Sequence, residues 1–376
     1  MKTSKYIYFF VLFTLFACAG TEIEEETATD LDKDIIYLDD NGVTIKASSR
    51  SKIGDIKEIN GITYTVVDLD SLKKLIQINA DLSKVVVSKI TNMSLLFQYK
   101  ADFNQNLSNW DVSNVTSMDN MFRATSFNSD ISFWDVSKVT NMNAMFRDTP
   151  FNQDISTWNV SNVTFMGELF RNTPFNNDIS SWNVSNVQNM GGMFRGTPFN
   201  QDISNWDVSN VTKMPEMFRD SDFNQSINSW EVDNVDNMGG LFRDSDFNQP
   251  LNSWNMSNVL TMAAMFKNSS FNQNVENWNV SKVKDMTDVF QDCVSFNQNI
   301  SNWDISQVTF IDGMIDRTAI SPENYDAILL QWSSLNLNKD LNFGAREVTY
   351  CNEESSRQKI TTNFNWIISD GGLDCN

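Results

Sequence analysis

Large apolar residues recur through most of the chain at a fixed interval of 24 residues, with one late step of 25. The tryptophans keep this interval most strictly: Trp110, Trp134, Trp158, Trp182, Trp206, Trp230, Trp254, Trp278 and Trp303. Two phenylalanine series, which begin at Phe103 and Phe122, follow the same period. A fixed period of this length is typical of a solenoid, in which each copy forms one coil and adjacent coils share a core. The pattern predicts about ten coils of 24–25 residues across residues 85–320.

Within one copy, the hydrophobic pattern changes its spacing. Trp158 and Val160 alternate with polar neighbours, as in a short strand. Val163, Met166 and Leu169 then recur at three-residue steps, as on one face of a short helix. We therefore expect an α/β fold in which each coil is right-handed and contains one short strand and one short helix.

The residues on either side of the repeat predict separate small units that cover its open ends. In residues 34–84, Asn41 before Gly42 and Asn60 before Gly61 lie between apolar runs, which is typical of tight hairpin turns. Asp70 is expected to cap a short helix that follows these hairpins. Residues 34–84 are thus predicted to form a β-rich unit.

The C-terminal segment, residues 321–376, is expected to be helical. Ser321 followed by Pro322 is typical of a helix start, and a second helix is expected at about residues 353–364. A strand is expected at residues 365–368, before a turn. This segment is predicted to cover the last coil.

Three cysteines lie beyond the N-terminal region. Cys351 and Cys375 bracket the C-terminal segment, and a disulfide between them would stabilise it by about 3 kcal/mol. Cys293 is expected to be a buried free thiol. A metal site made by all three cysteines is the alternative, but the spacing lacks closely placed ligands.

An asparagine follows each phenylalanine of the Phe103 series. The nine residues are Asn104, Asn128, Asn152, Asn176, Asn200, Asn224, Asn248, Asn272 and Asn297. If they are buried, such side chains can satisfy backbone groups of their own coil and of the adjacent one. We expect a structural ladder.

A row of basic residues keeps the same period: Arg123, Arg147, Arg171, Arg195, Arg219, Arg243 and Lys267. Stacked cations repel one another unless acids lie between them. We expect a salt-bridge spine with these partners: Asp130, Asp154, Asp178, Asp202, Asp220, Asp222, Asp244 and Asp246. A row that binds anions is the alternative.

The N-terminal residues predict export. Lys2 and Lys5 precede an apolar run at residues 6–16 that is too short to span a membrane comfortably. Cys18 directly follows a Leu-x-Ala pattern that resembles a bacterial lipoprotein box, so residues 1–18 are expected to be a signal peptide that ends in lipidated Cys18. An ordinary signal peptide is the alternative. The acidic residues 19–33 are expected to form a flexible tether. These features predict a protein of the cell envelope, lipid-anchored to the bacterial outer membrane and exposed at the surface.

The amino-acid composition excludes several classes of catalytic and binding site. The chain has no histidine, which excludes imidazole acid–base catalysis and histidine-ligated metals. Its formal net charge of −20 argues against contacts with nucleic-acid phosphates. We expect no cofactor, no metal and no nucleic-acid partner.

Residues 134–156 carry nearly every recurrent residue of the repeat. They read Trp-Asp-Val-Ser-Lys-Val-Thr-Asn-Met, then Met-Phe-Arg and Phe-Asn-Gln-Asp-Ile-Ser. This pattern resembles the BspA-type leucine-rich-repeat surface protein family, over about residues 35–376. The resemblance implies a leucine-rich-repeat-like solenoid displayed on bacterial cells. Members of that family are described as adhesins for host or extracellular-matrix proteins, and the resemblance supplies no catalytic residue.

The residues beside each tryptophan are expected to point away from the core. The candidate ligand-binding row consists of Asp111, Phe133, Asp135, Asn159, Asn183, Asp207 and Glu231. Such a polar row suits a protein or glycan better than a small apolar molecule. We expect a monomeric, non-catalytic binding module or adhesin that engages an extracellular or host protein or glycan through this face.

Three alternatives remain open. The face could be a solvated surface with no ligand. The acidic rows could bind divalent cations such as Ca²⁺ in a structural envelope protein. A hydrolase could pair two carboxylates from neighbouring coils, but no single coil breaks the pattern as an active site would.

Overall fold

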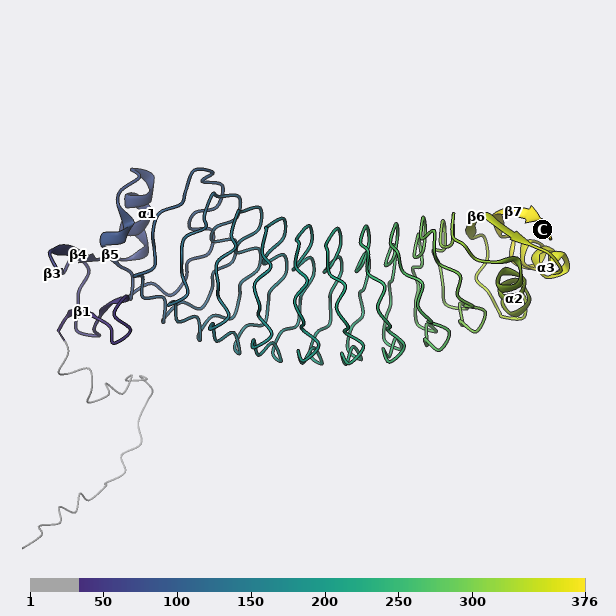
Figure 1. The fold of residues 1–376 in the computed structure, drawn as a ribbon, viewed down its shortest axis with the longest axis horizontal. Coiled ribbons are helices and arrows are strands. Elements are labelled where there is room, and N and C mark those ends of the chain that lie inside the picture. Colours follow the sequence, from purple (N-terminus) through teal and green to yellow (C-terminus); the bar gives the residue numbers. More distant parts are fainter. Residues whose placement is uncertain (1–33, 376) are drawn as a thin grey trace, which may run out of the picture.

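The computed structural model describes residues 34–375 as an elongated stack of coils that runs between two small end units (Figure 1). Successive coils lie side by side along the long axis, so the chain is a tandem-repeat solenoid. The predicted signal peptide and tether, residues 1–33, lie outside the described residues. Within residues 34–375, no helix combines the length and the apolar character that crossing a membrane requires.

The N-terminal unit contains the two hairpins that the sequence predicts. Strand β1 (Ile36–Leu38) pairs antiparallel with β2 (Ile45–Ala47), and β3 (Ile56–Ile59) pairs antiparallel with β4 (Ile62–Val66). Both turns contain an Asn-Gly pair. Asn60, Gly61 and Gly42 have positive φ angles, which asparagine and glycine adopt at low cost.

Helix α1 (Leu69–Gln77) follows these hairpins. Its cap is Asp68, whose carboxylate accepts the N–H of Ser71 at 2.8 Å. The predicted cap, Asp70, is wrong because it lies inside the first turn. Two short elements lead into the coils, η1 (Leu82–Lys84) and β5 (Val85–Val86), and β5 pairs in parallel with β4.

The coils themselves consist of turns. In the described chain between β5 and helix α2 (Pro322–Trp332), there is no helix and no regular strand. The strand predicted at Trp158 and the helix predicted after Val163 are therefore both wrong. Residues spaced by three and four do face the core, but a series of tight turns brings them there.

Two turns of one type form the part of each coil for which a helix was predicted. In the first, the N–H of Leu169 donates to the carbonyl of Met166 at 3.2 Å, and the third residue, Glu168, has a φ of 56°. The second turn ends at Thr173 and places Asn172 at the same φ. A positive φ at the third position defines a type II turn.

Alternate N–H groups of these turns point to the following coil. The N–H of Glu168 donates to the carbonyl of Gly191 at 2.8 Å, and that of Phe170 donates to Met193 at 3.0 Å. Parallel bridges between coils link ten positions in series: Asn92, Ser117, Asn141, Phe165, Asn189, Lys213, Asn237, Thr261, Asp285 and Phe310. The contact between coils thus lies several residues after each tryptophan.

Aromatic rings fill the interior of the stack. Phe146 is fully buried, and its ring stacks on that of Phe151 in the same coil with a centroid distance of 3.8 Å. It also lies parallel to Phe170 of the next coil at 6.0 Å and tilts against Trp158 at 6.3 Å. Ring pairs of this kind add about 0.5–1.5 kcal/mol each beyond the area they bury. The tryptophans share one environment, as the period predicts.

The asparagine ladder is present, but at the surface. The N–H of Asn152 donates to Asn128 Oδ1 at 2.9 Å, and that of Asn200 donates to Asn176 Oδ1 at 3.0 Å. These side chains therefore join neighbouring coils as expected. None of the nine asparagines is buried: each is half-buried or exposed, so the ladder forms without the burial considered above.

The C-terminal unit begins with α2, which Ser321 caps by accepting the N–H of Asn324 at 3.4 Å. Three elements follow, β6 (Asn342–Tyr350), α3 (Glu354–Phe364) and β7 (Ile367–Leu373), and the two strands pair in parallel. Strand β6 was not predicted, and β7 extends through the residues for which a turn was expected. Strand β6 continues the stack, because Ile315 donates its N–H to the carbonyl of Gly344 at 3.1 Å.

The structure contains a disulfide between Cys351 and Cys375, the pair for which the sequence predicts a bond. Cys293 is free and fully buried. Burial raises the pKa of the Cys293 thiol to about 11, and hydrogen bonds with Ser269 and Phe271 only partly oppose this effect. Cys293 is therefore an inert thiol in the folded chain.

Candidate functional site

The predicted ligand row lies on turns and not on strands. Except for Glu231, its acids and amides accept the N–H of the serine two residues later: Asp207 from Ser209 at 3.0 Å, and Asn159 from Ser161 at 3.2 Å. This arrangement is an Asx turn. The hydrogen bonds from the hydroxyl and the N–H of Ser209 hold the pKa of Asp207 below its usual value. The oxygens of the row therefore help to fix the backbone even where they face solvent.

Most of this row is exposed, one residue per coil. The exposed acids and amides are Asp135, Asn159, Asn183, Asp207 and Glu231. Phe133, beside the first of them, has 49% of its surface exposed. The row is thus a repeating edge of hydrogen-bond acceptors with a single aromatic ring near its N-terminal end.

Asp111 does not share this exposure, so the expectation that it lies on the open face is wrong. It is 5% exposed because strand β2 continues onto the first coils. Ile45 pairs in parallel with Trp110, and its N–H donates to the carbonyl of Asn109 at 2.9 Å. The carboxylate of Asp111 accepts both the N–H and the hydroxyl of Ser113.

The basic row forms a salt-bridge spine, but largely with other acids than predicted. Glu216 Oε1 lies 2.6 Å from Arg219, and the other carboxylate oxygen of Glu216 pairs with Arg195 of the preceding coil. Asp244 was predicted correctly and contacts Arg219 at 3.5 Å and Arg243 at 3.1 Å. The acids of the spine therefore alternate with its cations between adjacent coils.

The other predicted partners have a different role. Asp154, Asp178 and Asp202 each accept the N–H of the serine two residues later at 2.9 Å. These hydrogen bonds lower the pKa of each carboxylate. The prediction that they pair with arginines is wrong, because the arginines pair instead with Asp148, Glu168, Glu216 and Asp244.

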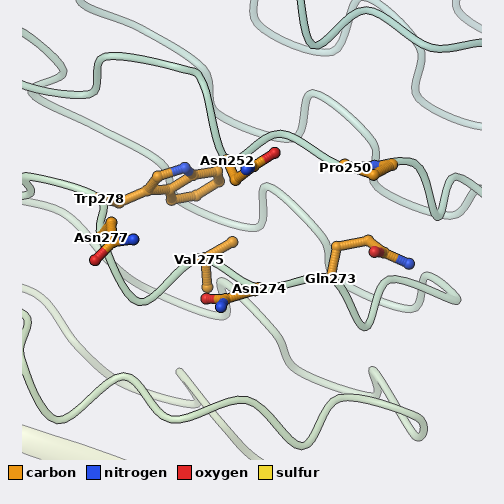
Figure 2. A pocket seen from close by; sticks show the side chains of 7 residues that line it. All are labelled: Pro250, Asn252, Gln273, Asn274, Val275, Asn277 and Trp278. Carbon is orange, nitrogen blue, oxygen red and sulfur yellow. The ribbon is translucent and has the colours of Figure 1, made fainter.

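A hollow of about 280 Å³ lies between two neighbouring coils. Figure 2 shows Trp278 at its left and Pro250 at its right, with Val275 and the side-chain amides around the space between them. The residues that line it are Pro250, Asn252, Gln273, Asn274, Val275, Asn277 and Trp278. Its polar groups are therefore uncharged amides beside the edge of an indole ring.

The hollow occurs where the repeat changes. Position 250, which in four earlier coils is an aspartate of an Asx turn, is occupied by proline. Asn252 replaces the serine of that turn, and its Oδ1 accepts from Asn228 Nδ2 of the preceding coil at 3.1 Å. The loop of this coil therefore lacks the Asx turn of the earlier coils, whereas Asn274 restores the turn in the next coil by accepting the N–H of Glu276 at 2.8 Å.

Comparison with known proteins gives one family. Residues 68–174, 149–246 and 240–337 each match the family described as "Mycoplasma protein of unknown function, DUF285". Together these matches cover well over half of the chain. The chain belongs to the DUF285 family. No curated protein and no solved structure matches this DUF285 chain.

The geometry of the DUF285 chain limits what its hollow and rows can do. None of the seven residues that line the hollow in Figure 2 carries a carboxylate, so it lacks the acid pair that glycoside hydrolysis uses. Across residues 34–375, no group of three or more His, Cys, Asp or Glu side chains is placed to hold a metal ion. The groups that this hollow and the exposed row present are amides and single carboxylates, which can form hydrogen bonds with a ligand.

Sequence reasoning missed the hollow of this DUF285 chain, although a signal was present. The aspartate of the Asx turn is replaced by Ser226 and then by Pro250 in two successive coils. This break in the repeat marks the coils whose loops lack that turn. The burial of Asp111 had no comparable signal, because nothing in the repeat indicates where β2 lies.

Proposed function

We propose that this DUF285 protein is a bacterial surface lipoprotein that acts as a non-catalytic binding module or adhesin. In this proposal it is a monomer of the BspA-type leucine-rich-repeat class, with a right-handed solenoid of about ten coils closed by a unit at each end. Cys18 carries the lipid anchor at the membrane. The ligand is an extracellular protein or glycan.

The exposed row carries the proposal. It presents one hydrogen-bonding group per coil, and all of these groups except Glu231 are held by their own Asx turns, as at Asp207 and Asn159. Groups held in place by the backbone lose little freedom when a ligand binds, which favours affinity. A regular series of acceptors also matches a ligand that is itself extended, such as a polypeptide or a sugar chain.

A pair of matched triple variants tests the row. Asp135→Ala, Asp207→Ala and Glu231→Ala together should weaken binding to immobilised extracellular-matrix proteins or to an arrayed glycan by about tenfold or more. The control combines Asp154→Ala, Asp178→Ala and Asp202→Ala, since these acids are equally exposed and two of the three row acids make the same Asx turn.

The control should bind like the unaltered protein and should show any loss of stability that comes from the turns alone. Unchanged binding by the row variant would remove the row from the proposed function. Equal losses in both variants would show that the turns and not the row are responsible.

The anchor is tested separately. Cells grown with an alkyne-bearing fatty acid should label the unaltered protein, and Cys18→Ser should abolish the label and release the protein from the membrane fraction. Labelling that persists in the variant would contradict lipidation at Cys18.

A further inference from the structure

A second hollow lies where strand β2 meets the first coils, with a volume of about 650 Å³. Three lysines line it, Lys46, Lys89 and Lys138, together with the single acid Asp111. The formal net charge of the whole chain is −20, so a site with more cations than acids in its lining departs from the rest of the molecule.

Two of these lysines replace an asparagine of the repeat. In most coils, the residue four positions after tryptophan is an asparagine whose Nδ2 donates to a serine carbonyl of the preceding coil, as Asn162 does to Ser137 at 2.7 Å. At this position Lys138 instead donates to Asn114 Oδ1 at 2.7 Å. Lys89 holds the corresponding place in the first, degenerate copy. The solenoid does not need a cation here, since an asparagine serves at this position in most of the other coils.

The lysines belong to an ordered wall. Lys89 Nζ donates to the carbonyls of Ser48 at 3.0 Å and Ser49 at 3.1 Å, which fixes the segment that follows β2. Lys46 forms an ion pair with Asp39 at 2.9 Å. Burial by itself would lower the pKa of Lys46. The hydrogen bond with Asp39 and the nearby charge of Asp111 outweigh burial, so the pKa is raised overall and the ammonium stays protonated.

The hollow also contains an unsatisfied buried hydroxyl. Ser48 is 2% exposed and lines the hollow, and its Oγ has no hydrogen-bond partner in the described structure. A buried hydroxyl without a partner destabilises the folded state, so such groups are uncommon unless a ligand or water completes them. Further hydroxyls line the same space, on Ser88, Thr91 and Ser113.

We propose that this hollow binds one anionic sugar unit, whose carboxylate or sulfate group contacts Lys89 and Lys138 and whose hydroxyls contact Ser48 and its neighbours. The inference rests on the proposed function, because it names a ligand class for the binding module. It uses a different part of the chain from the exposed row.

The lining favours a sugar over an acidic peptide. Hydroxyl and amide groups predominate, and only Tyr37 and Ala47 offer apolar surface, so peptide side chains would find little to pack against. The volume is sufficient for a ligand of one or two sugar rings. The ring of Tyr37 can pack against the apolar face of a sugar, while ammonium groups pair with its acid.

Calorimetric titration of the full chain tests the proposal. The probes are a uronic-acid disaccharide, a sulfated disaccharide, the neutral disaccharide of the same linkage and a glutamate-rich peptide. At least one acidic sugar should bind, more tightly than the neutral sugar and the peptide, and its affinity should fall as salt is raised. The two acidic sugars distinguish carboxylate from sulfate recognition.

Two lysine variants supply the matched comparison. Lys138→Asn restores the residue of the repeat and should weaken binding of the acidic sugar by about tenfold. Lys282→Asn is the control, because Lys282 holds the same position in a distant coil and donates to Asn258 Oδ1 at the same 2.7 Å. Ser48→Ala should also weaken binding without lowering the melting temperature, since it removes an unsatisfied group.

Several results would overturn the inference: no binding of either acidic sugar, equal binding of the neutral sugar, preference for the peptide, or equal effects of the two lysine variants. If Ser48→Ala leaves the affinity unchanged, the Ser48 hydroxyl is not part of the binding site. The row variant described above separates the two proposals, since it should leave this site intact.

Discussion

At the scale of single residues, the same side chain serves its own coil and its neighbours. The ring of Phe194 is fully buried, stacks on Phe199 at 3.9 Å and lies 5.9 and 5.8 Å from Phe170 and Phe218 in the adjacent coils. Loss of one ring therefore disturbs three coils. By contrast, Phe133 is about half exposed.

We expect Phe194→Ala to lower the free energy of unfolding by about 3–5 kcal/mol, the range for deletion of a buried aromatic side chain. Phe133→Ala should change it by less than about 0.5 kcal/mol. Urea unfolding followed by tryptophan fluorescence measures both. Similar losses in the two variants would contradict the description of one stacked core.

The exposed row shows which residue properties follow from sequence. Alternation around the tryptophans correctly places Asp135, Asn159 and Asp207 outside the core, because the neighbours of a buried residue usually face away from it. Alternation does not reveal their Asx turns, since the same spacing fits a strand. The burial of Asp111 depends on a contact with β2, which is distant in sequence.

At the scale of one coil, the period of the apolar residues is ambiguous. Val163, Met166 and Leu169 fit a helix, yet the stretch is too short for that pattern to decide between a helix and turns. A better indicator lies at the left-handed positions of the turns, such as Asn172 and Asp220, because asparagine and aspartate tolerate a positive φ better than most residues. Attention to these positions would have favoured turns.

The spine gives a pH-dependent contribution to stability. Burial raises the pKa of Glu216, but the hydrogen bond with Arg219 and the charges of Arg195 and Arg219 lower it more. Because the folded pKa is below that of the unfolded chain, the stabilisation is present above the usual value near 4.5 and is lost as the pH falls below it.

We therefore expect Glu216→Gln to lose under about 1 kcal/mol for each of its partly exposed ion pairs at pH 7. The difference in the free energy of unfolding between this variant and the unaltered protein should shrink between about pH 5 and pH 3. Over this range, protonation removes the charge of Glu216 in the unaltered protein. Urea unfolding across this range is the measurement, with Glu231→Gln, outside the spine, as control. A difference that stays constant with pH would contradict the assigned charge effect.

The C-terminal unit is held by covalent and polar links. The disulfide joins Cys351 to Cys375, 24 residues apart. The buried carboxylate of Asp326, on α2, accepts the N–H groups of residues 351–353. The helices of this unit were predictable from caps and apolar spacing, whereas β6 was not, since its sequence does not alternate.

Replacement of both cysteines by serine should lower the stability of this unit by about 3 kcal/mol. Hydrogen exchange should become faster in β6 and β7 and remain unchanged in the coils between residues 158 and 254, because each coil contacts only its neighbours. Reduction of the unaltered protein should reproduce the effect. Faster exchange throughout the coils would show instead that the whole stack unfolds with its end.

At the scale of the whole molecule, stability belongs to the array. Donors of one coil meet acceptors of the next, as between Glu168 and Gly191, so no coil satisfies its backbone alone. Equivalent positions repeat every 24 residues, and a whole coil can therefore be removed without changing the contacts of those that remain.

Deletion of residues 183–206 should leave a folded chain that is shorter by about 5 Å, the spacing of adjacent strands. The deletion joins Trp182 to Asp207, a Trp-Asp pair found in other copies, and brings Arg171 to the place of Arg195 beside Glu216. Small-angle scattering measures the length. Deletion of residues 195–206 breaks the register of the repeat, so this second variant should not fold. If both deletion variants fold, the 24-residue unit is contradicted.

The direction of the hydrogen bonds has a consequence for assembly. Strand β6 accepts the last donors of the stack, the N–H groups of Ile315 and Arg317. Without β6 these groups would face solvent at an end built to receive another coil, and such an edge can recruit a second chain. Most backbone N–H donors that link the coils point to the next coil, as those of Ala144 and Glu168 do, so the two faces of a coil differ. Copies would therefore join head to tail and grow into an open filament, not a closed dimer. Strand β6 thus prevents the repeats of separate chains from joining end to end, and the molecule keeps a finite length.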